Sequence, residues 1–329
     1  MMGVCRRSNP AVEEMHDYDG PPHAWGVVLA GGKGTRLAGL TRRLYGEDRP
    51  KQYAVLTGRK SLLRQTLDRV SVLIPAHRTV VVTMAGQGSY MSAELRHESP
   101  KPHVLEQPKD RGTAAAVMLA AHRILAQDPD AVLMVLPSDH FVGDDKLFMA
   151  HIAEVVEFLE HRPEHIVLLG AEPSEPETDY GWIELGEPVP RSGRSPIYRV
   201  LSFREKPSQA TADELFRTGA LWNTFVFVGR ASALVEAGRA CLPSLHERLA
   251  RLDSFLGTEH ERWALGQAYE LAQRASFSRA ILERRPEKLS VMRLSGVAWC
   301  DLGTPERVAR TLDGLGVRPE WATALGVAG

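Results

Sequence analysis

The sequence predicts an α/β fold in which helices cover both faces of a mixed, mainly parallel sheet. Two observations support this prediction. Short apolar runs alternate with amphipathic segments along the chain, and the runs are continuous rather than apolar at every second residue. Continuous apolar strands are buried on both faces, which is typical of parallel sheets. With 329 residues, 43% of them hydrophobic, the chain can form one large domain, or a large domain with an appendage.

The expected elements alternate from Trp25 onward. Strands are predicted in WGVVLA, RTVVVTM, HVLEQ, AVLMVLPSD and HIVLLGAEP, and helices in SLLRQTLDRV, SYMSAELRH, GTAAAVMLAAHRILAQ and LFMAHIAEVVEFLE. After Pro173 the strand-like segments YGWIELG, IYRVLSFREKP and LWNTFVFVG contain more polar residues. We expect them to form an antiparallel or mixed addition at one edge of the sheet, as a lid over the strand ends.

Three regions follow from this pattern. Residues 1–23 lack the apolar segment of a signal peptide and are predicted to be a mobile N-terminal arm. Residues 24–240 are expected to form the α/β core with its lid. Residues 241–329 are expected to be mainly helical and to return a segment, about 289–304, to the core.

The composition argues against several classes of protein. Lys and Arg number 40 against 41 Asp and Glu, so neither nucleic acid nor an anionic membrane is expected as an electrostatic partner. Cys5, Cys241 and Cys300 are far apart and show no C-x-x-C spacing, which disfavours a disulfide framework or a structural zinc site. No apolar run is long enough to span a bilayer. These features predict a cytoplasmic protein.

The stretch VVLAGGKGTRLAGLTRR, residues 27–43, combines a strand, a glycine-rich turn and the start of a helix. It fits neither familiar phosphate motif, because Lys33 lies between two glycines and Leu37 stands where a dinucleotide fingerprint needs glycine. Backbone N–H groups of consecutive glycines can approach phosphate oxygens, and Arg36 can bind them bidentately. A glycine-rich turn with incidental surface cations is the alternative, and the loop alone does not decide between them.

A second motif, DRPKQY, places Lys51 directly after a proline that restrains the backbone. A lysine at this place can neutralise charge that develops on a transferred phosphate, although most lysines are simply solvated at the surface. Together, LAGGKGTRL and PKQ resemble the sugar-phosphate nucleotidyltransferases, and Gln52 after PK is the form seen in mannose-1-phosphate guanylyltransferases. The resemblance implies a Rossmann-like fold with an antiparallel sugar-binding extension and a helical C-terminal part.

Two aspartates are candidates for a metal site. Asp139 in VLPSDH follows an apolar strand, and Asp301 in WCDLGTP precedes a glycine turn. Mg²⁺ prefers one or two carboxylates together with phosphate oxygens and water. Taken singly, each aspartate is more often a helix cap or turn residue, and Thr304 is itself a candidate cap. The family has metal aspartates in PSDH-type and W-x-D-x-G motifs, so the resemblance implies Mg²⁺, or another divalent cation, on Asp139 and Asp301. His140 is not assigned to the metal.

The resemblance also implies the substrate-binding residues. For the nucleotide these are Leu29, Ala30, Gly31, Gly32, Lys33, Gly34, Thr35, Arg36, Gln107, Gly112, Thr113 and Ser138. For the sugar phosphate they are Tyr180, Gly181, Glu205, Lys206 and Asn223. The residue types alone do not separate guanine from another base, and the adjacent Glu205 and Lys206 could be a plain surface pair.

Four positions depart from the family pattern. The family reads closer to ETGYGYI where this chain has ETDYGWI, so Asp179 and Trp182 differ. The family usually has glycine in place of Phe225, and Gly39 stands where a proline is usual. These departures leave the reaction type intact and leave the identity of the sugar open.

The resemblance extends from about Trp25 to about Leu312 and implies an activity. GMP would pass from GTP to mannose 1-phosphate by in-line attack on the α-phosphate, giving GDP-mannose and pyrophosphate, with Arg36, Lys51, Asp139 and Asp301 as catalytic residues. Both reactants are already oxyanions, so no general base is required. Open alternatives are glucose 1-phosphate with UTP, dTTP or ATP, and a catalytically silent regulatory subunit that binds a nucleotide sugar. The missing third glycine disfavours a dinucleotide-dependent oxidoreductase. Neither nucleic acid nor membrane is an expected partner, and a homodimer stays open.

Overall fold

The computed structural model describes residues 20–190, 193–317, 319 and 321. Residues 1–19 of the predicted arm lie outside the described residues. The last residues of that arm contact the body of the protein, because the Arg78 side chain donates a hydrogen bond to the backbone oxygen of Pro21 at 2.7 Å.

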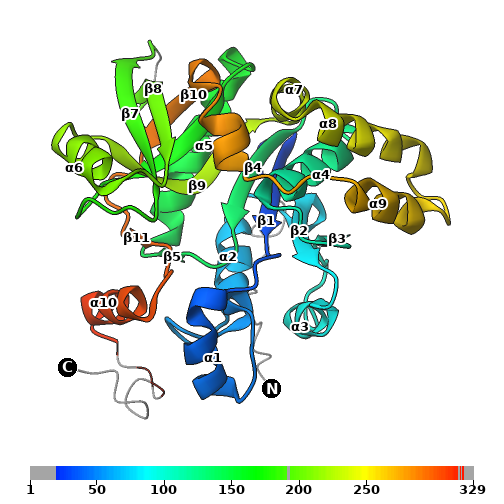
Figure 1. The fold of residues 1–329 in the computed structure, drawn as a ribbon, viewed down its shortest axis with the longest axis horizontal. Coiled ribbons are helices and arrows are strands. Elements are labelled where there is room, and N and C mark those ends of the chain that lie inside the picture. The colour runs from blue at the N-terminus through cyan, green and yellow to red at the C-terminus, as the bar shows by residue number, and fades with distance from the viewer. Residues whose placement is uncertain (1–19, 191–192, 318, 320, 322–329) are drawn as a thin grey trace, which may run out of the picture.

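The elements alternate between strand and helix through the first half of the chain, as the sequence predicts (Figure 1). The main sheet contains β1 (Ala24–Leu29), β2 (Thr79–Met84), β3 (His103–Gln107), β4 (Val132–Pro137), β6 (Ile166–Ala171), β7 (Gly181–Pro188), β8 (Ile197–Glu205), β9 (Leu221–Arg230) and β10 (Leu289–Arg293). The helices are α1 (Ala38–Tyr45), α2 (Leu62–Val70), α3 (Gly88–Glu94), α4 (Thr113–Leu125), α5 (Asp145–His161), α6 (Gln209–Arg217), α7 (Ala231–Cys241), α8 (Pro243–Ala250), α9 (Glu261–Glu270) and α10 (Pro305–Leu315). None of the helices in the described residues has the length and apolar character needed to cross a membrane.

The strand order is β3-β2-β1-β4-β9-β6-β10-β8-β7. Strands β3, β2, β1 and β4 pair in parallel, and so do β6 and β10. Strand β9 is antiparallel to β4 and β6, while β8 and β7 form an antiparallel hairpin at one edge. Among the described strands of this sheet, only β8 and β9 run against the common direction, which confirms the mixed, mainly parallel sheet.

The prediction for LWNTFVFVG was wrong in one respect. This segment becomes β9, which lies between β4 and β6 in the interior of the sheet, whereas the sequence placed it in an addition at the edge. Its polar residues, among them Asn223 and Thr224, favoured the edge of the sheet, yet both are buried. Only the hairpin of β7 and β8 forms the expected antiparallel edge.

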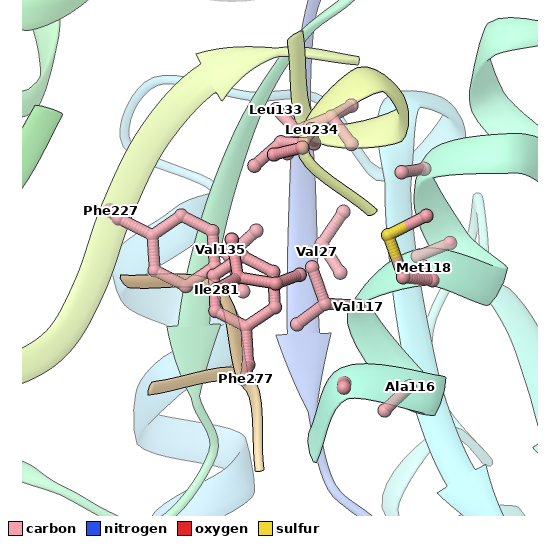
Figure 2. Close-up of a cluster of buried hydrophobic side chains, with 14 of the residues drawn as sticks. Val27, Ala116, Val117, Met118, Leu133, Val135, Phe227, Leu234, Phe277 and Ile281 are labelled. Atoms are coloured by element: carbon pink, nitrogen blue, oxygen red, sulfur yellow. The ribbon is translucent and has the colours of Figure 1, made fainter. Parts of the chain in front are cut away.

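Helices pack on both faces of the sheet. The side chain of Val27 on β1 joins a cluster with α4, α7, α8 and α9, and that of Val28 joins a cluster on the opposite face with α2 and α5. Successive strand residues point to opposite faces, so this division explains why the apolar runs are continuous. Figure 2 shows the first cluster, in which Val27 and Val135 pack near Met118 of α4 and the rings of Phe227 and Phe277.

The C-terminal part of the chain returns twice to the body of the protein. Strand β10 inserts between β6 and β8, and the short strand β11 (Trp299–Cys300) pairs with β5 (Phe141–Val142). In that pairing Cys300 lies opposite Phe141. The residue after β11, Asp301, is therefore brought beside the segment that carries Asp139. Helix α10 then packs through Val308 and Leu312 against the region of α1.

Candidate active site

A cavity of about 760 Å³ lies where β1, β2, β3 and β4 end. In open α/β sheets, the crevice at the carboxyl ends of the strands is the usual place for a ligand. Most of the residues that the sequence assigns to the nucleotide line this cavity, namely Leu29, Gly31, Gly32, Lys33, Gly34, Thr35, Gln107, Gly112, Thr113 and Ser138, together with Asp139. Ala30 and Arg36 do not line it.

The glycine loop rests directly on Lys51. Gly34 has φ of 62°, and a Cβ at this position would lie 2.7 Å from the backbone nitrogen of Lys51. Glycine is required here both for the left-handed backbone and for the close contact. The loop is also held by Gln52, whose amide nitrogen donates to the backbone oxygens of Ala30 at 2.8 Å and Gly32 at 2.9 Å. The residue after PK thus positions the loop, a role that the motif alone did not reveal.

Lys51 is 5% exposed and lies between the two predicted metal ligands. Its Nζ is 3.0 Å from Oδ2 of Asp139, and it also donates to the backbone oxygen of Asp301. Asp139 follows β4, and Asp301 follows β11. The two aspartates, 162 positions apart in the sequence, therefore converge on one ammonium group beside the glycine loop.

The Asp301 carboxylate has several donors around it. Oδ1 accepts from the Tyr180 hydroxyl at 2.8 Å, from the Gly303 N–H at 2.9 Å and from Arg307 at 3.1 Å. Thr304 caps α10, as the sequence suggested, by accepting from the Arg307 N–H at 3.3 Å. Tyr180 thereby links the predicted sugar-binding residues to the predicted metal ligand.

Charge determines the ionisation of both aspartates. Burial opposes ionisation of Asp139, but Lys51 and His140 outweigh it and lower the pKa of Asp139. Burial likewise opposes ionisation of Asp301, and His140, Arg307 and the Tyr180 hydroxyl lower its pKa. The pKa of His140 itself is lowered to about 4 by burial, so the ring carries the charge that favours the ionised aspartates only in acid and is neutral at pH 7. The ring packs edge-on against Trp299, with 5.3 Å between the ring centroids. Two carboxylates of this site are thus ionised at neutral pH.

Arg36 points toward carboxylates rather than lining the cavity. One guanidinium nitrogen lies 2.9 Å from Oδ2 of Asp179, and the other lies 3.5 Å from Oδ2 of Asp301. Asp179 belongs to the loop before β7 and is one of the departures from the family pattern. A second departure, Trp182, lies on β7, is fully buried and donates to the backbone oxygen of Glu177 at 2.8 Å.

The opposite wall of the cavity comes from a segment that the sequence reasoning missed. Arg274, Ala275, Ser276 and Arg279 line the cavity. Gly112, with φ of 80°, lies so close that a Cβ would be 2.3 Å from the backbone oxygen of Ala275. The only available signal was a polar, cationic stretch, QRASFSRA, which has no sequence motif of its own. It reaches the site through tertiary packing.

The predicted sugar-phosphate residues form a group beside the cavity, although they do not line it. A Cβ on Gly181 would lie 2.8 Å from Oε2 of Glu205 and 3.2 Å from Cβ of Asn223, so these three residues are in contact. Burial raises the pKa of Glu205, while Lys206 acts against that rise. Lys206 is exposed, and its N–H donates to the backbone oxygen of Tyr180 at 3.1 Å. Tyr180 therefore connects the predicted sugar-phosphate residues to Asp301, because its hydroxyl donates to that carboxylate.

Comparisons with known proteins point to one family. The family model described as Nucleotidyl transferase matches residues 25–313. The chain is similar to mannose-1-phosphate guanylyltransferase 2 of Escherichia coli O157:H7, with 33% identity over 290 residues that cover 84% of this chain and 58% of that protein. It is also similar to xanthan biosynthesis protein XanB of Xanthomonas campestris pv. campestris (strain B100), with 35% identity over 221 residues that cover 67% of this chain and 44% of that protein. The chain spans about half the length of these curated relatives.

One solved structure is similar to this chain over a larger share of its own length than these two curated relatives are. The crystal structure of mannose-1-phosphate geranyltransferase from Thermus thermophilus is 34% identical to this chain, with a TM-score of 0.74. The match covers 90% of this chain and 80% of that one.

Proposed function

This chain belongs to the nucleotidyl transferase family, and we propose that it transfers GMP from GTP to mannose 1-phosphate, giving GDP-mannose and pyrophosphate. The observation that carries the proposal is the convergence of Lys51, Asp139 and Asp301 beside the glycine-lined cavity. The choice of GTP and mannose 1-phosphate is supported by the names of the similar proteins and by Gln52 after PK.

The proposed reaction needs alignment and charge compensation more than proton transfer. A phosphate oxygen of the sugar 1-phosphate attacks the α-phosphorus of GTP in line, the bond to the bridging oxygen breaks, and pyrophosphate leaves. The backbone N–H groups of residues 31–35 would hold the triphosphate, and Lys51 would stabilise the negative charge that develops on the transferred phosphate. Both reactants are ionised, so holding two anions together is the principal task of the site.

We propose Mg²⁺ as the cofactor, held by Asp139 and Asp301. The ammonium group of Lys51 donates both to the carboxylate of Asp139 and to the backbone oxygen of Asp301, so the two residues lie close together. Both carboxyl groups have a lowered pKa and are ionised. The described residues offer no cluster of three or more acidic, histidine or cysteine ligands. A pair of carboxylates is nevertheless a set that suits Mg²⁺, because phosphate oxygens and water complete its coordination. When bound, the ion would neutralise charge on the phosphate oxygens.

The proposal is tested by measuring pyrophosphate release over a grid of nucleoside triphosphates and sugar 1-phosphates, with and without Mg²⁺. We expect GTP with mannose 1-phosphate to give the highest kcat/KM, and chelation of Mg²⁺ to abolish turnover. Another preferred pair would correct the substrates, and absence of turnover with every pair would contradict the enzymatic activity.

Variants of the two aspartates test the metal assignment. Asp139→Asn and Asp301→Asn should lower kcat by about 10²-fold or more, since each removes a charge that the site uses in the transition state. Asp213→Asn on α6, which is exposed and does not line the cavity, serves as the matched control. Full activity in either of the first two variants would remove that aspartate from the metal site.

A further inference from the structure

Phe225 has an unusual backbone conformation at the wall of the cavity. Its φ is 58°, in the left-handed region that favours glycine and that bulky residues rarely adopt. The strand is irregular here, because the pairing of β6 with β9 shifts register between Leu168 and Gly170. Bulges of this kind are known to redirect side chains near active sites. Backbone strain of this kind clusters at active sites and ligand-binding sites, which points to a function for the Phe225 side chain at the cavity wall.

The ring of Phe225 is part of the cavity lining and is only partly buried. It packs edge-on against two rings of the core, with centroid separations of 5.9 Å to Phe227 and 6.4 Å to Phe277. Those two rings stack on each other in the cluster drawn in Figure 2. They support the Phe225 ring from behind, so that it forms a firm wall rather than a mobile side chain.

The same turn determines the orientation of a predicted sugar-binding residue. The N–H of Phe225 donates to Oδ1 of Asn223 at 3.1 Å. The carbonyl oxygen of the Asn223 amide is thereby occupied, and its NH₂ group is left as a donor for a hydroxyl oxygen. Asn223 in turn contacts Gly181, which contacts Glu205. Phe225 thus lines the cavity wall and, through its hydrogen bond to Asn223, also contacts the predicted sugar-phosphate-binding residues.

We infer that Phe225 is a specificity-determining residue for the sugar 1-phosphate, an inference that rests on the proposed function. Its ring narrows the cavity beside Asn223, so that the site accepts hexose 1-phosphates with small substituents and rejects those with a bulky acetamido group. Gln107, Gly112 and Thr113, which are predicted to bind the nucleotide, line the same cavity.

The test compares kcat/KM for mannose 1-phosphate and N-acetylmannosamine 1-phosphate in Phe225→Gly and Phe225→Leu. Glycine removes the wall and tolerates the positive φ, whereas leucine keeps much of the bulk. In Phe225→Gly we expect the ratio of kcat/KM for the acetamido sugar to that for mannose 1-phosphate to rise by about 10-fold or more, because even one methylene in a pocket typically discriminates about 10–200-fold. Phe225→Leu should keep the ratio near that of the unmodified protein.

Phe216→Leu on α6 is the matched control, since Phe216 is a partly exposed ring that does not line the cavity. An unchanged ratio in a folded Phe225→Gly variant, or an equal rise in Phe216→Leu, would overturn the inference while leaving the proposed function intact. If the unmodified protein converts no nucleoside triphosphate with any sugar 1-phosphate, the proposed function is wrong and so is this inference.

Discussion

The ammonium group of Lys51 lies 3.0 Å from the carboxylate of Asp139, and it also donates to the backbone oxygen of Asp301. One buried cation therefore holds the ends of β4 and β11 together. Its neighbours leave little freedom, because Gly34 contacts its backbone directly. Lys51 thus has a structural and an electrostatic part in the site.

Lys51→Met should lower kcat by about 10²–10³-fold, because the variant removes a positive charge placed where negative charge develops. Thermal unfolding should also begin at a lower temperature, since Asp139 loses its cation. The measurement is pyrophosphate release together with a thermal melt. Lys60→Met, at an exposed lysine paired with Asp68, is the matched control. Turnover within a few-fold of the unmodified protein would contradict a role of Lys51 in the reaction.

Gly34→Ala should reduce both stability and nucleotide binding. The added Cβ would meet Lys51 at 2.7 Å in a left-handed backbone, and such strain costs about 1–3 kcal/mol. Gly39→Ala on α1 is a matched control, because a Cβ there meets nothing within 4 Å. Alanine in a helix interior stabilises by up to about 1 kcal/mol relative to glycine. Urea unfolding and KM for GTP should separate the two variants, and equal effects would argue against a specific packing constraint at Gly34.

Asp179→Asn tests whether the acidic loop before β7 competes with phosphate for Arg36. The Arg36 side chain is 51% exposed, so the ion pair contributes at most about 1 kcal/mol to stability. Removal of the charge should free Arg36 and lower KM for GTP by about two- to five-fold at low salt, a range consistent with that energy. The difference should shrink at high salt, which screens exposed charges. A higher KM in the variant would show instead that Asp179 holds Arg36 in its productive position.

The histidine pair between α4 and α8 predicts a loss of stability in acid. Burial, aided by the neighbouring charge of His246, lowers the pKa of His122 to about 4, and the two rings lie 5.1 Å apart. Between that value and about 6.5, the ordinary pKa of histidine, the unfolded chain binds more protons than the folded one. Stability should therefore fall as the pH drops from 6.5 to 4, by up to about 3 kcal/mol from this residue.

His122→Gln cannot gain that proton and should show a shallower pH dependence of the free energy of unfolding. Chemical denaturation at several pH values between 7 and 4.5 provides the measurement. The exposed His260→Gln should keep the slope of the unmodified protein. Parallel curves for the unmodified protein and His122→Gln would show that His122 is not responsible for the acid sensitivity.

The strands of the parallel part of the sheet could be predicted from local pattern, because a run such as VVLA is apolar on both faces wherever it lies in the sheet. The position of β9 could not. Whether a strand lies at the edge or in the centre depends on which strands pair with it, and the polar residues Asn223 and Thr224 wrongly favoured the edge. Pairing is a long-range choice that a local pattern does not contain.

For the site, the sequence by itself was enough to nominate the glycine loop, Lys51, Asp139 and Asp301, since motifs record the chemical types that phosphate and metal require. Their meeting at one ammonium group was decided by tertiary structure, through the pairing of β5 with β11. The same holds for Arg274 and Arg279, which reach the cavity wall only because their segment packs against Gly112, and for Arg36, which is turned toward Asp179. Distances between side chains depend on packing of segments far apart in the chain, and no spacing within one segment encodes them.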